Sequence, residues 1–124
     1  VKLNLSDDLT KAEALFKKHQ IRHIPVVYSN NIVGMLSYSD LLRISFVDSI
    51  DDDEEVIDAT VYNMFTLEQV MVKKLVIISP DTLIKDAAEI LASKEYHSLP
   101  VCDGDLLVGI LTTTDLIKYL IDQY

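Results

Sequence analysis

The sequence contains two copies of one pattern, and this internal repeat constrains the fold more than any other feature. Residues 21–43, IRHIPVVYSNNIVGMLSYSDLLR, align without a gap with residues 96–118, YHSLPVCDGDLLVGILTTTDLIK. The proline, the glycine and the aspartate of the first copy recur 75 residues later. A chain of 124 residues is long enough for one domain or for two small halves that share a core. The repeat favours two halves built to one plan.

Each copy predicts the order strand, helix, strand, strand, helix. In the second copy the β-branched run 75–79 ends at Pro80 and is typical of a strand. Thr82 is then expected to cap a helix with a buried stripe at Ile84, Ala87, Ala88 and Leu91. In the first copy Asp7 takes the place of Thr82, and the corresponding stripe consists of Leu9, Ala12, Leu15 and Phe16.

Two apolar runs follow each of these helices and are joined by a tight turn, because YSNN and CDGD carry turn-forming residues. The second run of each pair, IVGML or LLVGIL, is continuous, so we expect that strand to be buried on both faces. An amphipathic helix closes each copy. Thr66 and Gln69 form a capping-box pattern, which predicts a short helix leading into the second copy. We therefore place the first repeat at 1–50, an acidic linker at 51–65 and the second repeat at 66–124.

Composition and charge argue against several classes of protein. Lys and Arg number 11 against 20 Asp and Glu, a formal charge of −9, whereas nucleic-acid binding requires a basic patch. No apolar run approaches the roughly 18 residues of a membrane span, although 49 % of the residues are hydrophobic. The start of the sequence does not resemble a signal peptide. The single cysteine, Cys102, is expected to be a buried thiol in a reducing cytoplasm.

The duplicated pattern Gly-x-x-[Ser/Thr]-x-x-Asp, GMLSYSD and GILTTTD, has two compatible interpretations. A hydroxyl followed three residues later by a carboxylate is typical of a helix start, which makes Ser37 and Thr112 N-caps. Asp40 and Asp115 would then lie near the positive end of the helix dipole. The same arrangement gathers amide donors, a hydroxyl and a carboxylate, which suit a phosphate and the two hydroxyls of a ribose. A capped helix start can therefore also be a ligand site.

Two tandem copies of hydrophobic-Pro-Val followed by Val-Gly-hydrophobic-hydrophobic-[Ser/Thr]-x-x-Asp resemble a pair of CBS domains, the regulatory unit called a Bateman module. The resemblance implies a mixed α+β fold, in which tandem β-α-β-β-α repeats pack as a pseudo-two-fold pair. It also implies two clefts for adenosine-containing ligands such as AMP, ADP, ATP or S-adenosylmethionine. The implied ligand-binding residues are Arg22, His23, Ile24, Pro25, Ser37, Asp40, Ser79, His97, Ser98, Leu99, Pro100, Thr112 and Asp115.

The resemblance also implies roles within this set. The two aspartates would hold ribose hydroxyls, the hydroxyls three residues earlier would face phosphate or sugar, and the backbone at each hydrophobic-Pro pair would border adenine. The two residues before each pair would contact phosphate. Because Arg22 is a permanent cation that the second copy lacks, we expect the first cleft to bind a phosphorylated nucleotide more tightly. Leu5 stands where the second copy has Pro80, and the leading segment is cut off at Val1, so this cleft can be incomplete.

Other candidates for chemistry are weaker. His19 and His23 are spaced like half of a zinc site, but no glutamate lies between them. The acidic run 51–55 is interpreted as a solvated linker rather than a magnesium site. No serine, cysteine or lysine is paired with a base as a nucleophile, so we expect neither catalysis nor a catalytic cofactor or metal.

These observations predict a cytoplasmic regulatory module that senses an adenine nucleotide and passes a conformational signal to its contacts. A homodimer is expected, and neither nucleic acid nor membrane insertion is. The alternative is a dimerisation or interaction module of a larger protein that binds no ligand.

Overall fold

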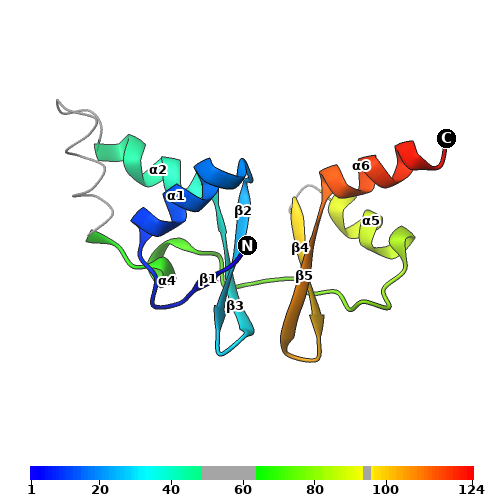
Figure 1. The fold of residues 1–124 in the computed structure, drawn as a ribbon, viewed down its shortest axis with the longest axis horizontal. Helices are drawn as coiled ribbons and strands as arrows, with labels where there is room; N and C mark the ends of the chain where they lie inside the picture. The colour runs from blue at the N-terminus through cyan, green and yellow to red at the C-terminus, as the bar shows by residue number, and fades with distance from the viewer. Residues whose placement is uncertain (49–63, 94–95) are drawn as a thin grey trace. The chain divides into compact units, whose positions relative to one another are not determined.

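Two β-hairpins, each accompanied by helices, make up the fold (Figure 1). The computed structural model describes residues 1–48, 64–93 and 96–124. These residues form two units: the first comprises Val1–Ser29 and Val33–Lys74, and the second comprises Asn30–Ile32 and Leu75–Tyr124. Each unit combines helices with strands, which confirms the predicted mixed α+β class.

The first unit follows the predicted order of elements. Its elements are β1 (Leu3–Asn4), α1 (Leu9–His19), β2 (His23–Tyr28), most of β3 (Asn31–Ser37), α2 (Tyr38–Asp48) and α4 (Leu67–Val70). β1 runs parallel to β2, with Leu3 opposite Val26, and β2 neighbours β3. The turn between β2 and β3 holds Ser29 and Asn30 at φ values of 52° and 68°, as the favoured two-residue hairpin turn requires.

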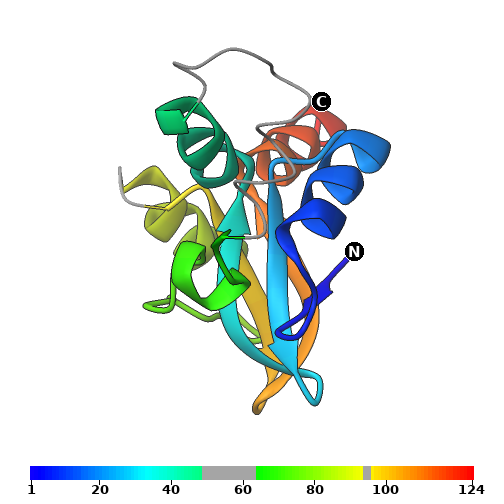
Figure 2. The ribbon, with the colours of Figure 1, turned by 90° about the vertical axis from the view of Figure 1, so that its left-hand side faces the viewer.

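The core of the first unit lies between its helices and its strands. Figure 2, which faces this unit, shows α2 at the end of the hairpin opposite the turn. The rings of Phe16 and Tyr38 lie 5.2 Å apart between α1 and the start of α2. Ten buried residues form the core cluster: Leu3, Leu9, Ala12, Phe16, Ile24, Val26, Leu36, Leu41, Leu67 and Met71. The predicted stripe of α1 is therefore confirmed, with Leu15 half-buried beside it.

The short helix α4 is capped as predicted. Thr66 Oγ1 accepts the Gln69 N–H at 3.3 Å, and Gln69 Oε1 accepts the Thr66 N–H at 2.8 Å. Residues after α4 cover β3, because Met71 packs against Gly34 and Val72 exchanges two 2.9 Å backbone hydrogen bonds with Met35. The segment thus belongs in space to the first unit. The linker predicted at 51–65 falls almost entirely outside the described residues.

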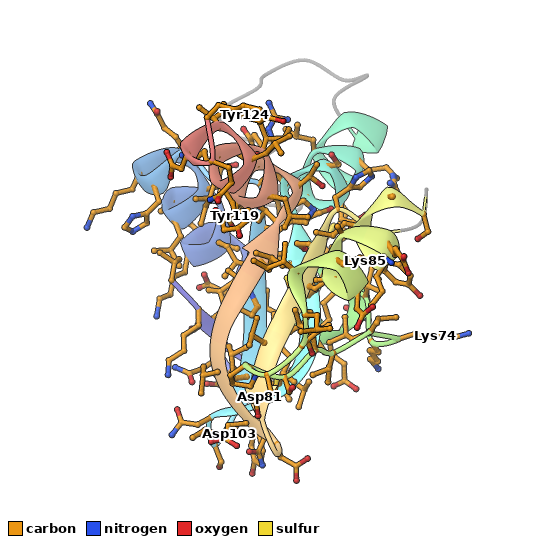
Figure 3. All side chains as sticks on the ribbon, turned by 90° about the vertical axis from the view of Figure 1, so that its right-hand side faces the viewer. Lys74, Asp81, Lys85, Asp103, Tyr119 and Tyr124 are labelled. Carbon is orange, nitrogen blue, oxygen red and sulfur yellow. The ribbon has the colours of Figure 1, made fainter. Side chains whose placement is uncertain are left out.

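The second unit repeats this plan with a smaller core. Its elements are α5 (Ile84–Ala92), β4 (Ser98–Asp103), β5 (Leu106–Thr112) and α6 (Thr113–Asp122). β4 and β5 are antiparallel, from Ser98 opposite Thr112 to Asp103 opposite Leu106. Figure 3 shows Asp103 near the hairpin turn and Tyr119 on α6 at the other end of the hairpin. The buried residues of this core are Ile78, Ala87, Leu91 and Leu99.

The strand predicted at 75–79 is reduced to a single bridge. In the first unit, Leu3 pairs with Val26 and the Leu5 N–H donates to the Val27 carbonyl at 2.9 Å. Seventy-five residues later, Ile78 forms a parallel bridge with Val101, but Pro80 occupies the position of Leu5. Proline has no N–H to donate, so the ladder is not extended beyond this bridge.

Two predicted helix caps are wrong by one residue. Thr82 Oγ1 accepts the Ser79 N–H at 3.0 Å, and α5 begins after Leu83 without a side-chain cap. In the first unit, Asp7 Oδ2 accepts the Asn4 N–H at 2.8 Å, whereas Asp8 caps α1. The side chains of Asp7 and Thr82 therefore stabilise the turns before α1 and α5 and do not cap these helices. Ile84, predicted to be buried, is the first residue of α5 and is 47 % exposed.

The two central strands differ in burial. Gly34, Met35 and Leu36 of β3 are buried, as predicted: the segment after α4 covers Gly34 and Met35, and Leu36 belongs to the core cluster. No residue of β5 is fully buried, so the prediction for β5 is wrong within its unit. Among the described residues, none lies within 4 Å of the place that a Cβ on Gly109 would take. The segment after α4 therefore accounts for part of the difference in burial between β3 and β5.

Candidate functional site

The hairpin of each unit brings the residues before its first strand next to the end of its second strand. In the first unit, the Tyr38 N–H at the start of α2 donates to the Arg22 carbonyl at 2.8 Å. In the second unit, the Thr113 N–H donates to the His97 carbonyl at 3.4 Å. The two donors are 75 residues apart in the sequence, and so are the two acceptors. In each unit, the repeat therefore brings the residues predicted to contact phosphate close to those predicted to contact ribose.

The hydroxyl of each motif caps the helix that follows. The Asp40 N–H donates to Ser37 Oγ at 3.0 Å, and the Asp115 N–H donates to Thr112 Oγ1 at 3.1 Å. Both bonds satisfy amides of the first helical turn that have no partner within the helix. The capping interpretation of the motif is therefore confirmed in both copies.

The two motif carboxylates have different partners. Asp115 Oδ2 accepts the Thr112 N–H at 2.9 Å and completes a capping box. Asp40 Oδ1 lies 3.4 Å from Arg43 Nη2, one turn further along α2. Asp40 is half-buried, whereas Asp115 is exposed. Each carboxylate retains lone pairs that can accept further hydrogen bonds.

At the two hydrophobic-Pro pairs, backbone atoms rather than side chains are available to contact a ligand. Ile24 and Leu99 are completely buried in the cores of their units, and Pro25 and Pro100 are buried as well. Side chains so placed cannot reach a ligand without leaving the core. Only backbone atoms of these residues could border a base, as the sequence resemblance implies.

Ser79 lies apart from the other predicted residues of the second unit. It follows the bridge between Ile78 and Val101, and Val101 is three positions along β4 from Ser98. Three strand residues span roughly 10 Å. Asn4 is the equivalent residue of the first unit and makes the equivalent backbone contact with Asp7. The sequence interpretation omitted Asn4, although the 75-residue spacing identifies it.

The sequence profile of the CBS domain matches residues 1–46 and 67–122, which include both copies of the motif. The chain belongs to the CBS domain family. An uncharacterized protein of Methanocaldococcus jannaschii, MJ1426, is 28 % identical over 138 aligned residues, which cover 93 % of this chain and 82 % of that protein. The match confirms two CBS repeats, as the sequence resemblance predicts, although residues 67–74 of the second match pack with the first unit.

Solved structures have the same fold. The structure of CBSX2 in complex with AMP superposes with a TM-score of 0.79 at 20 % identity, covering 99 % of this chain and 88 % of that chain. MJ1225 of M. jannaschii gives a TM-score of 0.81 at 22 % identity, covering 97 % of this chain but only 44 % of that chain. The family match supports a regulatory rather than a catalytic module.

A cavity of about 390 Å³ lies in the first CBS repeat, away from the predicted ligand residues. It lies between the turn after β1 and the end of β2, at the opposite end of β2 from Arg22 and His23. It is lined by Asn4, Leu5, Ser6, Val27, Tyr28 and Ser29. Of these, Asn4 alone corresponds to a predicted ligand residue, through its equivalent Ser79.

Side chains that could bind a metal do not converge in the described part of the CBS repeats. No group of three or more His, Cys, Asp or Glu side chains suited to a metal occurs there. His19 ends α1 and His23 begins β2, with Gln20 in a left-handed conformation between them, so the two do not share a helix face. The predicted acidic run 51–55 lies outside the described residues.

Cys102 is a buried thiol, as the sequence predicts, and is 3 % exposed. Burial, with a smaller contribution from the charge of Asp105, raises the pKa of this thiol. A raised pKa lowers the fraction of reactive thiolate. None of the described helices has the length and apolar character of a membrane span.

Proposed function

We propose that this CBS pair is a regulatory module that binds an adenine nucleotide and transmits a conformational signal. The observation that carries the proposal is the twofold occurrence of one arrangement, a hydroxyl, a carboxylate and a polar segment at the open end of a hairpin. The AMP complex of CBSX2, which has the same fold, supports this ligand class.

In the proposed complex, each motif aspartate accepts hydrogen bonds from the ribose hydroxyls, and Ser37 and Thr112 face the sugar or phosphate. Arg22 and His23 in the first repeat, and His97 and Ser98 in the second, contact phosphate. The backbone at the two hydrophobic-Pro pairs borders the adenine. We also propose Ser79 as a ligand contact, although it is not beside Thr112 within its own repeat.

The signal follows from linkage between ligand binding and conformation. A nucleotide shifts the equilibrium between two arrangements of the repeats only by its difference in affinity for them. The reduced, buried Cys102 fits a reducing compartment, so we propose that the module works in the cytoplasm.

Thermal unfolding with AMP, ATP and S-adenosylmethionine tests the proposal. A ligand present at 100 times its Kd stabilises the native state by about 2.7 kcal/mol. A rise in Tm with one of the three ligands supports the proposal, and no shift with any of them contradicts it.

Aspartate substitutions then locate the nucleotide. Because the first repeat contributes Arg22, we expect Asp40→Ala to weaken AMP binding more than Asp115→Ala does. The loss of affinity from Asp40→Ala should be roughly tenfold or more, because hydrogen bonds to a charged group are lost. Isothermal calorimetry measures both, with Asp103→Ala at the exposed turn as the matched control. A larger loss from Asp115→Ala would refute the assignment of the tighter site to the first repeat.

The alternative function, an interaction module, is favoured by one face of α6. Ile117, Leu120 and Ile121 are 53, 56 and 64 % exposed, and their spacing places them on one stripe. We propose that this stripe supports a homodimer. Ile121→Lys is expected to halve the mass measured by light scattering, whereas Asp122→Lys beside it should not. A dimer that binds none of the three nucleotides would favour the alternative.

A further inference from the structure

Arg43 lies over the carboxylate that the proposed function assigns to ribose. Its Nη2 is 3.4 Å from Asp40 Oδ1, and the two residues are one helical turn apart on α2. The Asp40 side chain is 18 % exposed and that of Arg43 is 74 % exposed. The guanidinium therefore contacts a half-buried carboxylate from the solvent side.

The second repeat holds its carboxylate in another way. Lys118 stands 75 residues after Arg43, but among the described ion pairs none joins it to Asp115. The Thr112 N–H donates to Asp115 Oδ2 at 2.9 Å instead. One motif aspartate is thus oriented by a side chain and the other by backbone.

We propose that Arg43 is a positioning residue that orients Asp40 for the ribose hydroxyls. The inference rests on the proposed function. A guanidinium carries only donors, so its contact at Oδ1 leaves Oδ2 and a second lone pair of Oδ1 to accept two hydroxyls. The positive charge of the Arg43 guanidinium also offsets the repulsion between the Asp40 carboxylate and a nearby phosphate.

The size of the effect is set by the exposure of Arg43. Exposed ion pairs contribute modestly, so removal of Arg43 is expected to weaken binding by about two- to fivefold. A direct phosphate contact by Arg43 would produce a loss of similar size, and the ribose hydroxyls separate the two cases. Orientation of Asp40 matters only for a ligand that has those hydroxyls.

Calorimetry with AMP and with 2′,3′-dideoxy-AMP tests the inference on the whole chain. Arg43→Met is expected to weaken AMP binding about two- to fivefold and to leave dideoxy-AMP binding unchanged. Arg43→Lys should recover part of the loss. In the Asp40→Ala background, Arg43→Met should not weaken AMP binding any further. Lys118→Met in the second repeat is the matched control and should bind AMP like the unmodified chain.

The possible outcomes distinguish failure of the positioning role of Arg43 from failure of the proposed nucleotide binding. Equal losses for both ligands, or AMP binding that does not respond to Arg43→Met, would overturn the positioning role alone. Absence of AMP binding by the unmodified chain would overturn the proposed function and the positioning role with it. Loss confined to AMP, with no further loss in the Asp40→Ala background, supports the inference.

Discussion

At the scale of single residues, the three threonines of GILTTTDL have separate roles. Thr112 caps α6 and forms a reciprocal capping box with Asp115. Thr113 and Thr114 are exposed in the first turn of the helix. The first copy has Tyr38 and Ser39 at these two positions, so only the capping hydroxyl and the aspartate recur with the same bond.

Thr112→Ala is expected to destabilise the native state by about 1 kcal/mol, because it removes the side-chain acceptor of an N-cap. Urea unfolding measures the change. Thr114→Ala is the control, since it deletes an exposed hydroxyl two residues later and should change stability by no more than about 0.5 kcal/mol. Equal destabilisation by both substitutions would contradict the capping role.

Cys102 gives a pH dependence of known sign. Burial raises the pKa of its thiol in the folded state, so the folded chain holds the proton more tightly than the unfolded chain. The resulting stabilisation is complete below the unfolded pKa and is lost as the pH rises through the folded pKa. We therefore expect the unmodified chain to lose stability relative to Cys102→Ala between neutral and alkaline pH. Urea midpoints across that range measure the difference, and a constant difference would refute it.

At the duplicated Gly-x-x-[Ser/Thr]-x-x-Asp motif, the roles of the hydroxyls as helix caps were predictable. The pairing of Ser37 with Asp40, and of Thr112 with Asp115, follows from the motif and was confirmed. The partner of each carboxylate was not predictable, because the motif is the same in both copies. Whether an aspartate turns to an arginine or to a backbone N–H depends on side-chain rotamers that spacing does not determine.

At the scale of elements, the order of strands and helices was predictable, but their ends were less so. Thr82 and Leu83 are adjacent, and either could begin a helix in the sequence. The structure uses the Thr82 hydroxyl for the Ser79 N–H, a local hydrogen bond that competes with capping. The short ladder at Ile78 was foreseeable from Pro80, since proline cannot donate the bond that Leu5 donates in the first repeat.

The two motif glycines have different surroundings, which gives a matched pair of substitutions. A Cβ on Gly34 would overlap the Met71 side chain, whereas a Cβ on Gly109 would lie within 4 Å of no atom in the described part of the chain. We expect Gly34→Ala to destabilise the native state by about 1 to 3 kcal/mol, as overpacking does. Gly109→Ala should be neutral or slightly stabilising. Urea unfolding measures the free energy of unfolding of both variants. Equal effects would contradict the prediction, because they would mean that Met71 makes room for the new methyl group without loss of stability.

At the scale of the whole molecule, one sequence pattern produces two units of unequal burial. Val26 and Leu36 of the first unit are completely buried, whereas their equivalents Val101 and Leu111 are only half-buried. The segment after α4 accounts for part of this difference, because it packs against Gly34 and Met35 of β3. The repeat could not predict the inequality, since it compares the two copies and not the segments that pack on them.

Unequal burial predicts unequal resistance to local opening. Regions with few buried apolar contacts open at lower free energy than the global unfolding reaction. In native-state hydrogen exchange, the amides of β4 and β5 should therefore exchange faster than those of β2 and β3, which join a core of ten buried residues. Comparison of residues 75 positions apart controls for local sequence, because each pair shares its place in the hairpin. Equal protection of the two hairpins would mean that contacts beyond each unit's own core stabilise the second repeat.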